Sequence, residues 1–244
     1  MSKIAIVTGA GGGIGRAVAL RLAKDGMGLM LVDLKKEELL GTVRQAEDMG
    51  VRALYRNADV SDEAAVHEYM EQTVRSFGKL DVIAHCAAIT HKGNALEDID
   101  VKTSERIFRV NLLGSFLAIK HGLKIMKPQG SGVIICTGST NSLLGCPGLG
   151  VYSASKHGVL GLIKSAAGEN GYNGVRICGV IPGCTDTEMI SEFRDSVVQS
   201  SGPMRRIAQP SEIAECFSFL SRDEASYTNG SILVSNGGLG CCTT

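Results

Sequence analysis

The chain has 244 residues, enough for one α/β domain with a large core and too few for two enzyme domains of ordinary size. Its 25 Lys and Arg residues are balanced by 25 Asp and Glu residues. This balance argues against a general nucleic-acid or anionic-membrane binder, because such proteins usually carry a basic bias. We therefore expect one globular domain over residues 1–244 with neither nucleic acid nor membrane as a partner.

The eight cysteines are scattered along the chain with no Cys-x-x-Cys pair. Together with His they form no zinc-like spacing, so no metal site is predicted. Scattered thiols, several inside apolar runs, are typical of reduced cysteines and predict a cytoplasmic location. The chain enters a predicted strand at Lys3, which leaves no room for a signal peptide, and no apolar run reaches membrane-spanning length. Cys241 and Cys242 are interpreted as an incidental terminus in preference to a redox or metal handle.

A short apolar run, Ile4–Thr8, predicts a buried strand, followed by a glycine-rich turn and a helical pattern over Arg16–Lys24. In such a unit the backbone N–H groups and the dipole at the helix start favour a phosphate, and glycine lets the backbone approach it. Gly9, Gly13 and Gly15 give a Gly-x-x-x-Gly-x-Gly spacing. The strand before and the helix after favour a dinucleotide-binding turn over a plain turn.

A second apolar run, Gly28–Asp33, predicts a strand that ends in an acidic residue 18 residues after Gly15. An acid at about this distance suits hydrogen bonds to ribose hydroxyls and repels a 2′-phosphate. NAD is therefore favoured over NADP, and no Lys or Arg lies inside the glycine turn to hold that phosphate. Two alternatives stay open: Asp33 caps a helix over 35–49, or Lys35 and Lys36 hold the 2′-phosphate of NADP.

Strand and helix patterns then alternate to the end of the chain. Further strands are predicted over 51–56, 80–85, 132–137, 175–180 and 231–234. Helices are predicted from a cap at Ser61 or Asp62 to Phe77, over 101–126, over 151–169 and from Ser211. This alternation predicts a doubly wound α/β fold, with a mostly parallel seven-stranded sheet and helices on both faces. Ligands of such sheets bind at the carboxyl ends of the strands, where Gly9, Asp33, Asp59, Ala87, Ser139 and Pro182 fall.

Tyr152 and Lys156 stand four residues apart in the predicted helix over 151–169, so their side chains share one face. A phenol has an ordinary pKa of about 10, and an ammonium group beside it favours the phenolate and lowers that pKa. Tyr152 is therefore a candidate acid or base near neutral pH. Ser139 follows an apolar run and could hydrogen-bond the same reacting oxygen. The Tyr–Lys pair alone is weak evidence, because such spacings arise by chance.

Taken together, these features resemble the short-chain dehydrogenase/reductase family over nearly the whole chain. The matching marks, in order, are Thr8-Gly9-x-x-x-Gly13-Ile14-Gly15, Asp59-Val60, Asn111, Ser139, Tyr152-x-x-x-Lys156, Pro182-Gly183 with Thr187, and Asn236-Gly237-Gly238. Each mark alone is common, whereas all of them in this order are specific. The resemblance implies a single Rossmann-type domain that binds NAD(P).

The resemblance also implies a role for each matching residue. Tyr152 would give or take the proton on the substrate oxygen, Lys156 would lower its pKa and hold the nicotinamide ribose, and Ser139 would orient the substrate. Asn111, which its apolar neighbours predict to be buried, would anchor a water that continues the proton relay. Cofactor contacts are implied for Gly9, Gly13, Ile14, Gly15, Asp33, Asp59, Val60, Ala87, Ile181 and Thr187, besides Tyr152 and Lys156. A substrate pocket is implied near Asn141, Leu144, Cys146, Leu149, Cys184 and Met189, under a short polar segment over 188–206.

The chain departs from the family pattern after the fourth predicted strand. Where Asn-Asn-Ala-Gly is usual, it has His85-Cys86-Ala87-Ala88. Loss of the second Asn is expected to weaken the ties between neighbouring strands, and Ala88 puts a methyl group where the backbone crowds the cofactor. A milder departure is Asn236, where Asp is usual.

These observations predict an NAD-dependent oxidoreductase that interconverts a secondary alcohol, sugar or polyol and a ketone, with a homotetramer implied by the resemblance. A first alternative is an NADPH-dependent 3-oxoacyl-[acyl-carrier-protein] reductase. Lys124 and Lys127 would serve that alternative, whereas Asp33 and the lack of a basic residue in 169–174 argue against it. A second alternative is a non-catalytic dinucleotide-binding sensor or scaffold, against which the complete catalytic set argues.

Overall fold

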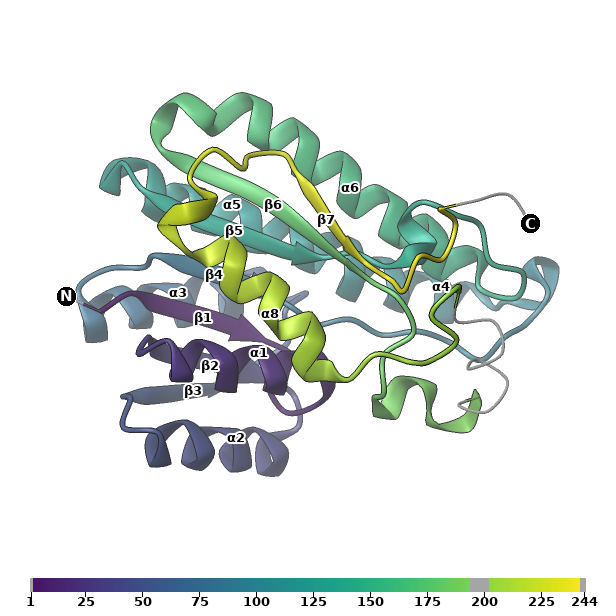
Figure 1. Cartoon of the computed structure of the whole chain (residues 1–244), viewed down its shortest axis with the longest axis horizontal. Coiled ribbons are helices and arrows are strands. Elements are labelled where there is room, and N and C mark those ends of the chain that lie inside the picture. Colours follow the sequence, from purple (N-terminus) through teal and green to yellow (C-terminus); the bar gives the residue numbers. More distant parts are fainter. Residues whose placement is uncertain (1, 194–201, 242–244) are drawn as a thin grey trace.

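The computed structural model describes residues 2–193 and 202–241. Its centre is a parallel seven-stranded sheet with the strand order β3-β2-β1-β4-β5-β6-β7 (Figure 1). The strands are β1 (Ile4–Thr8), β2 (Gly28–Asp33), β3 (Ala53–Asn57), β4 (Val82–His85), β5 (Gly132–Thr137), β6 (Val175–Pro182) and β7 (Ile232–Ser235). The chain winds outward from β1 to β3 and then restarts at β4 on the other side of β1. This switch point is where doubly wound sheets bind ligands, beyond the carboxyl ends of the strands.

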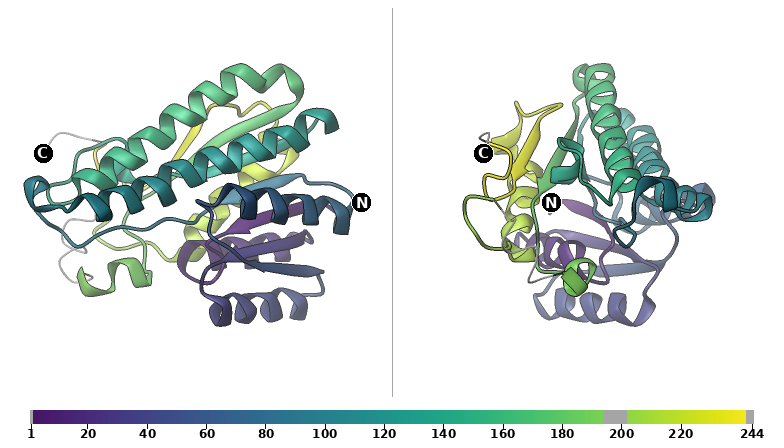
Figure 2. Two further views of the ribbon diagram at one scale, coloured as in Figure 1. Left: turned by 180° about the vertical axis from the view of Figure 1, so that it is seen from behind. Right: turned by 90° about the vertical axis from the view of Figure 1, so that its right-hand side faces the viewer.

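Helices cover both faces of the sheet (Figure 2). The α-helices are α1 (Gly13–Lys24), α2 (Lys36–Asp48), α3 (Glu63–Phe77), α4 (Val101–Ile107), α5 (Gly114–Gln129), α6 (Gly150–Asn170) and α8 (Pro210–Ser221). Short 3₁₀ turns are η1 (Leu96–Asp98), η3 (Thr140–Ser142), η4 (Gly171–Asn173), η5 (Glu188–Phe193) and η6 (Asp223–Ala225). The doubly wound prediction is confirmed. The ends of β1, β2 and β5 are the predicted ones, and those of the other four strands differ by at most two residues.

Each strand contributes alternate side chains to two separate cores, because successive strand residues point to opposite faces. Ala5 and Val7 of β1 pack in the core under α1, α2 and α8. Ile6 of β1 packs with Ile83 and Ile134 in the core under α3, α5 and α6. Both cores are apolar, so the strands read as near-continuous hydrophobic runs.

The predicted helix over 101–126 is interrupted by a π-helical turn, η2 (Phe108–Leu113). The backbone at both ends of this turn stays in the right-handed helical region, so α4, η2 and α5 follow one another without a loop. Such wide turns are rare and occur mostly at functional sites. Asn111 lies inside this one.

Helix starts follow local chemistry that the sequence predicted only in part. Asp62, one of the two predicted caps, accepts hydrogen bonds from the N–H groups of Ala64 and Ala65 at the start of α3. The helix predicted to begin at Ser211 begins one residue earlier. α8 begins at Pro210, and the Glu212 carboxylate accepts from the Gln209 N–H at 2.8 Å. Proline suits the first helical position because its missing N–H would be unpaired there.

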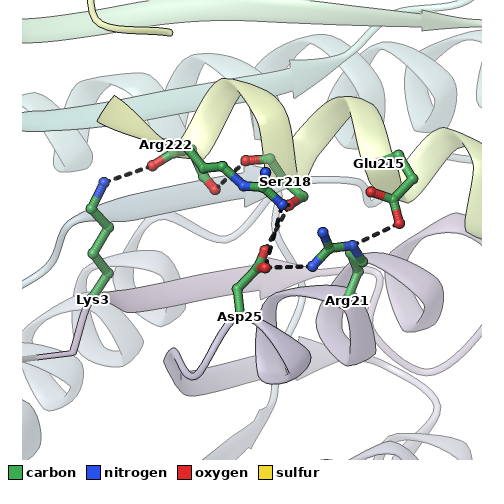
Figure 3. Close-up of polar contacts among 7 residues, drawn as sticks. Lys3, Arg21, Asp25, Glu215, Ser218 and Arg222 are labelled. Carbon is green, nitrogen blue, oxygen red and sulfur yellow. Dashed lines mark hydrogen bonds and ion pairs between the residues drawn. The ribbon is translucent and has the colours of Figure 1, made fainter. Parts of the chain in front are cut away.

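A charged network joins α1 to α8 near their carboxyl-terminal ends, at the amino-terminal edge of the sheet (Figure 3). Arg21 contacts Asp25 at 2.5 Å and Glu215 at 2.7 Å. Asp25 also accepts a 2.6 Å hydrogen bond from Ser218 and lies 3.5 Å from Arg222. Burial raises the pKa of Asp25, but its bonds to Ser218 and Arg21 outweigh that effect and leave it below the ordinary value. The network therefore fixes the two helices by matched charges.

Candidate functional site

The glycine turn is confirmed as a tight cradle at the carboxyl end of β1. Gly9 has a φ of 69°, and a Cβ there would lie 2.9 Å from the backbone nitrogen of Ala87. A Cβ on Gly15 would lie 2.0 Å from the carbonyl oxygen of Gly9. No side chain caps the first N–H groups of α1, which begins at Gly13. Uncapped N–H groups at a helix start, approached by a backbone free of Cβ atoms, fit the phosphates of a dinucleotide.

Asp33 lies beside this turn, as the sequence predicted. Its carboxylate accepts from the N–H of Gly11 at 2.8 Å and from the N–H of Lys35 at 2.9 Å. The structure does not show Asp33 as the cap of α2: that helix has Lys35 at its N-cap and no side-chain cap. A carboxylate has about four acceptor positions, so two remain for ribose hydroxyls.

Two cations lie near Asp33, one of which the sequence argument left out. The Lys35 ammonium pairs with Glu188 of η5 at 2.6 Å. Arg16, just after the turn, donates to the carbonyl oxygen of Gly11 and to the Thr42 hydroxyl. Both cations therefore have partners within the chain.

Asp59 and Val60 follow β3, next to the end of β2. The Asp59 carboxylate accepts from both the N–H and the hydroxyl of Ser61, each at 2.8 Å. Val60 is buried, and a Cβ on Gly114 of α5 would lie 3.0 Å from its side chain. The contact of this pair with adenine stays a prediction.

Threonine hydroxyls tie the central strands where the family pattern has asparagine. Thr8 Oγ1 of β1 accepts from the N–H groups of Cys86 and Ala87, at 3.1 and 3.2 Å. Thr137 Oγ1 of β5 donates to the carbonyl oxygen of His85 at 2.8 Å. The expected loss of ties between β1, β4 and β5 is therefore offset. The sequence argument did not predict these hydrogen bonds. The signal for them was a threonine at the end of each of two apolar strands, Thr8 in β1 and Thr137 in β5.

Tyr152 and Lys156 occupy one face of α6, and both are buried. The Lys156 nitrogen lies 5.8 Å from the centre of the Tyr152 ring and donates to the carbonyl oxygen of Thr137 at 2.8 Å. Ser139 follows β5, and its hydroxyl is a hydrogen-bond partner of the Tyr152 side chain. The structure therefore brings together Ser139 and the Tyr152–Lys156 pair, which begins 13 positions later in the sequence.

The prediction that Lys156 lowers the pKa of Tyr152 is wrong for this structure. Burial raises the pKa of Tyr152, and the hydrogen bond with Ser139 opposes that rise only in part. Burial also lowers the pKa of Lys156 to about 8. In the protein without bound dinucleotide, burial therefore determines the direction of the Tyr152 pKa shift, and the Lys156 ammonium donates to Thr137.

The neighbours that act electrostatically on Lys156 are neutral. Burial raises the pKa of Cys86 and of Cys136 to about 12. Burial and the Lys156 charge lower the pKa of His85 to about 3. At neutral pH this lysine is therefore surrounded by thiols and an uncharged imidazole.

Asn111 is buried, as predicted, with its side chain fully engaged. Its amide exchanges two 2.9 Å hydrogen bonds with the backbone of Ile89 and donates to Ser155 at 3.0 Å. The Ser155 hydroxyl in turn donates to the carbonyl oxygen of Tyr152 at 2.7 Å. Asn111 therefore holds the segment after β4 against the start of α6. Ser155 was missed by sequence reasoning, although a serine on an apolar helix face next to Lys156 was a signal.

The remaining predicted residues lie around the same edge of the sheet. Ile181 is buried in β6, and the Thr187 methyl group would lie 3.1 Å from a Cβ on Gly13. Cys146 and Cys184 are half-buried and close enough for one thiol to affect the pKa of the other. Asn141 lies in η3, whereas Met189 in η5 is exposed. Positions 194–201 of the segment 188–206, and Cys242, lie outside the described residues.

Across the described ranges 2–193 and 202–241, no cluster of His, Cys, Asp and Glu is arranged to hold a metal ion. Nor does any helix in those ranges have the length and apolarity needed to cross a membrane.

Comparison with known proteins gives matches over nearly the whole chain. Residues 9–240 match the family described as enoyl-(acyl carrier protein) reductase. The levodione reductase of Leifsonia aquatica is 35% identical over 251 residues, which cover 97% of this chain and 93% of that protein. The cyclohexanol dehydrogenase of Acinetobacter sp. (strain SE19) is 33% identical, with 97% of this chain and 94% of that protein covered.

The crystal structure of levodione reductase matches with a TM-score of 0.95 at 34% identity, covering 99% of this chain and 98% of that one. The glycine cradle, Asp33 and the buried Tyr152–Lys156 pair occupy the edge of the sheet where such a fold binds its ligand. On these sequence and structural grounds, the chain belongs to the short-chain dehydrogenase/reductase family of oxidoreductases.

Proposed function

We propose that the protein interconverts a secondary alcohol and a ketone with NAD(H) as the hydride carrier. The observation that carries the proposal is the buried group of Ser139, Tyr152 and Lys156 next to the glycine cradle. Gly9 lies against the backbone of Cys86 and Ala87 just after β4, and Lys156 donates to Thr137 at the end of the neighbouring strand β5, so the cradle and the lysine lie at the same edge of the sheet. A dinucleotide in the cradle would supply the hydride chemistry, and the chain supplies position and proton transfer.

The acid–base role falls to Tyr152. Because burial raises its pKa, the phenol is protonated at neutral pH in the free protein and is ready to donate to a carbonyl oxygen. Ser139 would donate a second hydrogen bond to the same oxygen and orient it. In the oxidative direction Tyr152 must release its proton, which the positive charge of Lys156 favours. Asn111 would support the proton path by holding Ile89 and Ser155 in place.

NAD is proposed over NADP because of the charges beside the adenosine end of the groove. Asp33 repels a 2′-phosphate, and Lys35 is paired with Glu188. Steady-state kinetics should give a higher kcat/KM with NAD than with NADP. A preference for NADP would contradict the assignment of Asp33.

A small ring alcohol is proposed as the substrate in preference to a sugar or polyol. The relatives named above act, by their names, on levodione and cyclohexanol. Apolar side chains are exposed just after Ser139, at Leu143 and Leu144, and Met189 is exposed in η5. Such a surface suits a ring with few hydroxyl groups.

A cytoplasmic homotetramer is proposed as the working form. The described cysteines are all free, which suits a reducing compartment. Phe108 of η2 and Phe116 of α5 are exposed, and a partner subunit that packs on these helices would cover them. Light scattering after size-exclusion chromatography should give four times the chain mass.

The central test replaces Tyr152 by Phe. Turnover of cyclohexanol with NAD should fall by at least about a hundredfold, because the proton donor is lost. NAD binding, measured by calorimetry, should persist, since the cradle is untouched. The matched control is Tyr172→Phe, which removes a hydroxyl from an exposed tyrosine at the end of the same helix region. Full activity of Tyr152→Phe would overturn the proposed mechanism.

A further inference from the structure

His85 is a buried imidazole that the proposed mechanism does not use. It ends β4 and is 2% exposed, with Thr8 of β1 and Cys136 of β5 as its Cα partners. On the same face, two residues earlier, Ile6, Ile83 and Ile134 pack in the core under α5 and α6. His85 therefore points toward the face of the sheet that α5 and α6 cover, and α6 carries Lys156. Thr137 of β5 contacts both residues, because its hydroxyl donates to the His85 carbonyl oxygen at 2.8 Å and its own carbonyl oxygen accepts from the Lys156 nitrogen at 2.8 Å.

The hydrogen bonds of Thr8 determine which nitrogen of His85 carries the proton. A threonine hydroxyl has one donor and two acceptor positions. Thr8 Oγ1 uses both acceptor positions for the N–H groups of Cys86 and Ala87. Its own proton is thus left for His85 Nδ1, at 3.1 Å. Nδ1 accepts, so the neutral imidazole must carry its proton on Nε2.

The Nε2–H group is a buried donor without a protein acceptor among the described residues. Buried donors are almost always satisfied, because a buried N–H group that loses its hydrogen bond to water and gains no other is unfavourable. Lys156 has three N–H groups, of which Thr137 receives one at 2.8 Å. Two neighbouring side chains thus both have donors to spare. A hydroxyl oxygen, with two lone pairs, is the acceptor that would satisfy both.

We propose that His85 is a positioning residue, whose Nε2–H and one N–H of Lys156 together hold a single hydroxyl oxygen. That oxygen belongs to water in the free protein or to a ribose hydroxyl in the NAD complex. By fixing this oxygen, His85 fixes the direction of the Lys156 ammonium beside Tyr152. The inference rests on the proposed catalytic role of Lys156. His85 does this without changing its charge, since burial keeps it neutral at working pH.

Neutron diffraction on the wild-type protein tests the geometry without any turnover. We expect a deuteron on His85 Nε2, none on Nδ1, and an oxygen within hydrogen-bond distance of both Nε2 and Lys156 Nζ. Crystals with and without NAD distinguish a ribose oxygen from water. A deuteron on Nδ1, or no oxygen shared with Lys156, would overturn the proposal. Because the neutron experiment measures no activity, its result does not depend on the outcome of the Tyr152→Phe test of the proposed function.

Three variants test the consequence for catalysis. Gln places its amide nitrogen where His has Nε2, Asn ends at the position of Nδ1, and Phe keeps the ring but neither nitrogen. His85→Gln should keep kcat within about threefold of wild type, whereas His85→Asn and His85→Phe should lower it about tenfold. The KM for the alcohol should change less than kcat, because the substrate itself is not touched.

The ranking of the variants decides between a positioning role and a merely structural one. If His85→Asn were as active as wild type and His85→Gln were impaired, only the bond to Thr8 would matter. Equal activity of all three variants would also overturn the proposal. Circular dichroism and thermal melting identify any variant that does not fold, and for such a variant the neutron result on wild type decides alone.

Discussion

At the amino-terminal edge of the sheet, the charges that join α1 to α8 are matched by opposite charges, whereas Lys156 at the other edge is buried among neutral groups. Arg21, Asp25 and Glu215 lie partly in solvent and form short ion pairs (Figure 3). Lys156 is 2% exposed, and no carboxylate of the described residues pairs with it. The first arrangement stabilises the fold, and the second keeps a lysine close to losing its proton. The amino-terminal edge of the sheet therefore stabilises the fold, and the carboxyl-terminal edge holds the proposed catalytic residues.

The largest expected effect is a loss of kcat when Lys156 is replaced, and Lys3 at the opposite edge of the sheet provides the control. Lys156→Met should lower kcat by about a hundredfold or more, because the group that supports proton transfer by Tyr152 is lost. Lys3→Met removes an exposed pair with Asp223 and should leave kcat unchanged. Initial rates of NADH formation measure both. Equal losses in the two variants would show that the comparison between the edges does not hold.

The free energy of unfolding should fall with decreasing pH because of His85, and His85→Gln should remove that part of the pH dependence. Its folded pKa of about 3 lies below the ordinary value of 6.5, so only the unfolded chain takes up this proton between those values. Stability from this group is present above pH 6.5 and is lost as pH falls. Between pH 6.5 and 4 the wild type should lose about 3 kcal/mol more than His85→Gln. Urea unfolding at several pH values measures the difference; parallel curves would contradict the burial of a neutral imidazole.

Burial of the charged Lys156 should lower the free energy of unfolding at neutral pH, and Lys156→Met should raise it. Its folded pKa of about 8 lies below the ordinary 10.5, so the folded protein loses this proton first as pH rises. Wild-type stability should therefore increase from pH 8 to 10.5 relative to Lys156→Met. At pH 7 the variant should be more stable by about 2 kcal/mol, less than the full linkage because the bond to Thr137 is also lost. Thermal melts at pH 7 and 10 check this, and a less stable variant at pH 7 would contradict it.

The smallest effect belongs to the charged network. Asp25→Asn should destabilise the fold by about 1 kcal/mol, because Arg21 and Ser218 lose a charged acceptor that is still partly open to water. Asp223→Asn, at the same edge but almost fully exposed, is the matched control and should change little. Urea unfolding measures both free energies. A change in kcat in either variant would show that the network affects the Tyr152–Lys156 site, which would contradict a purely stabilising role for this edge.

The sequence by itself determined the order of strands and helices, because buried parallel strands and amphipathic helices are local patterns. It also determined which residues could act. The glycine turn, Asp33, Ser139 and the Tyr152–Lys156 pair all fall where strands end or a helix begins. Its hydrophobic alternation was enough to place them at one edge of a doubly wound sheet.

Only the tertiary structure decided the electrostatic state of those residues. The pKa of Tyr152 rises and that of Lys156 falls because both side chains are buried in the folded chain. The hydrogen bonds of the Asn111 side chain and of the Thr8 and Thr137 hydroxyls likewise join residues that are distant in sequence. Spacing tells which side chains share a face, but burial and hydrogen-bond partners depend on what packs against that face.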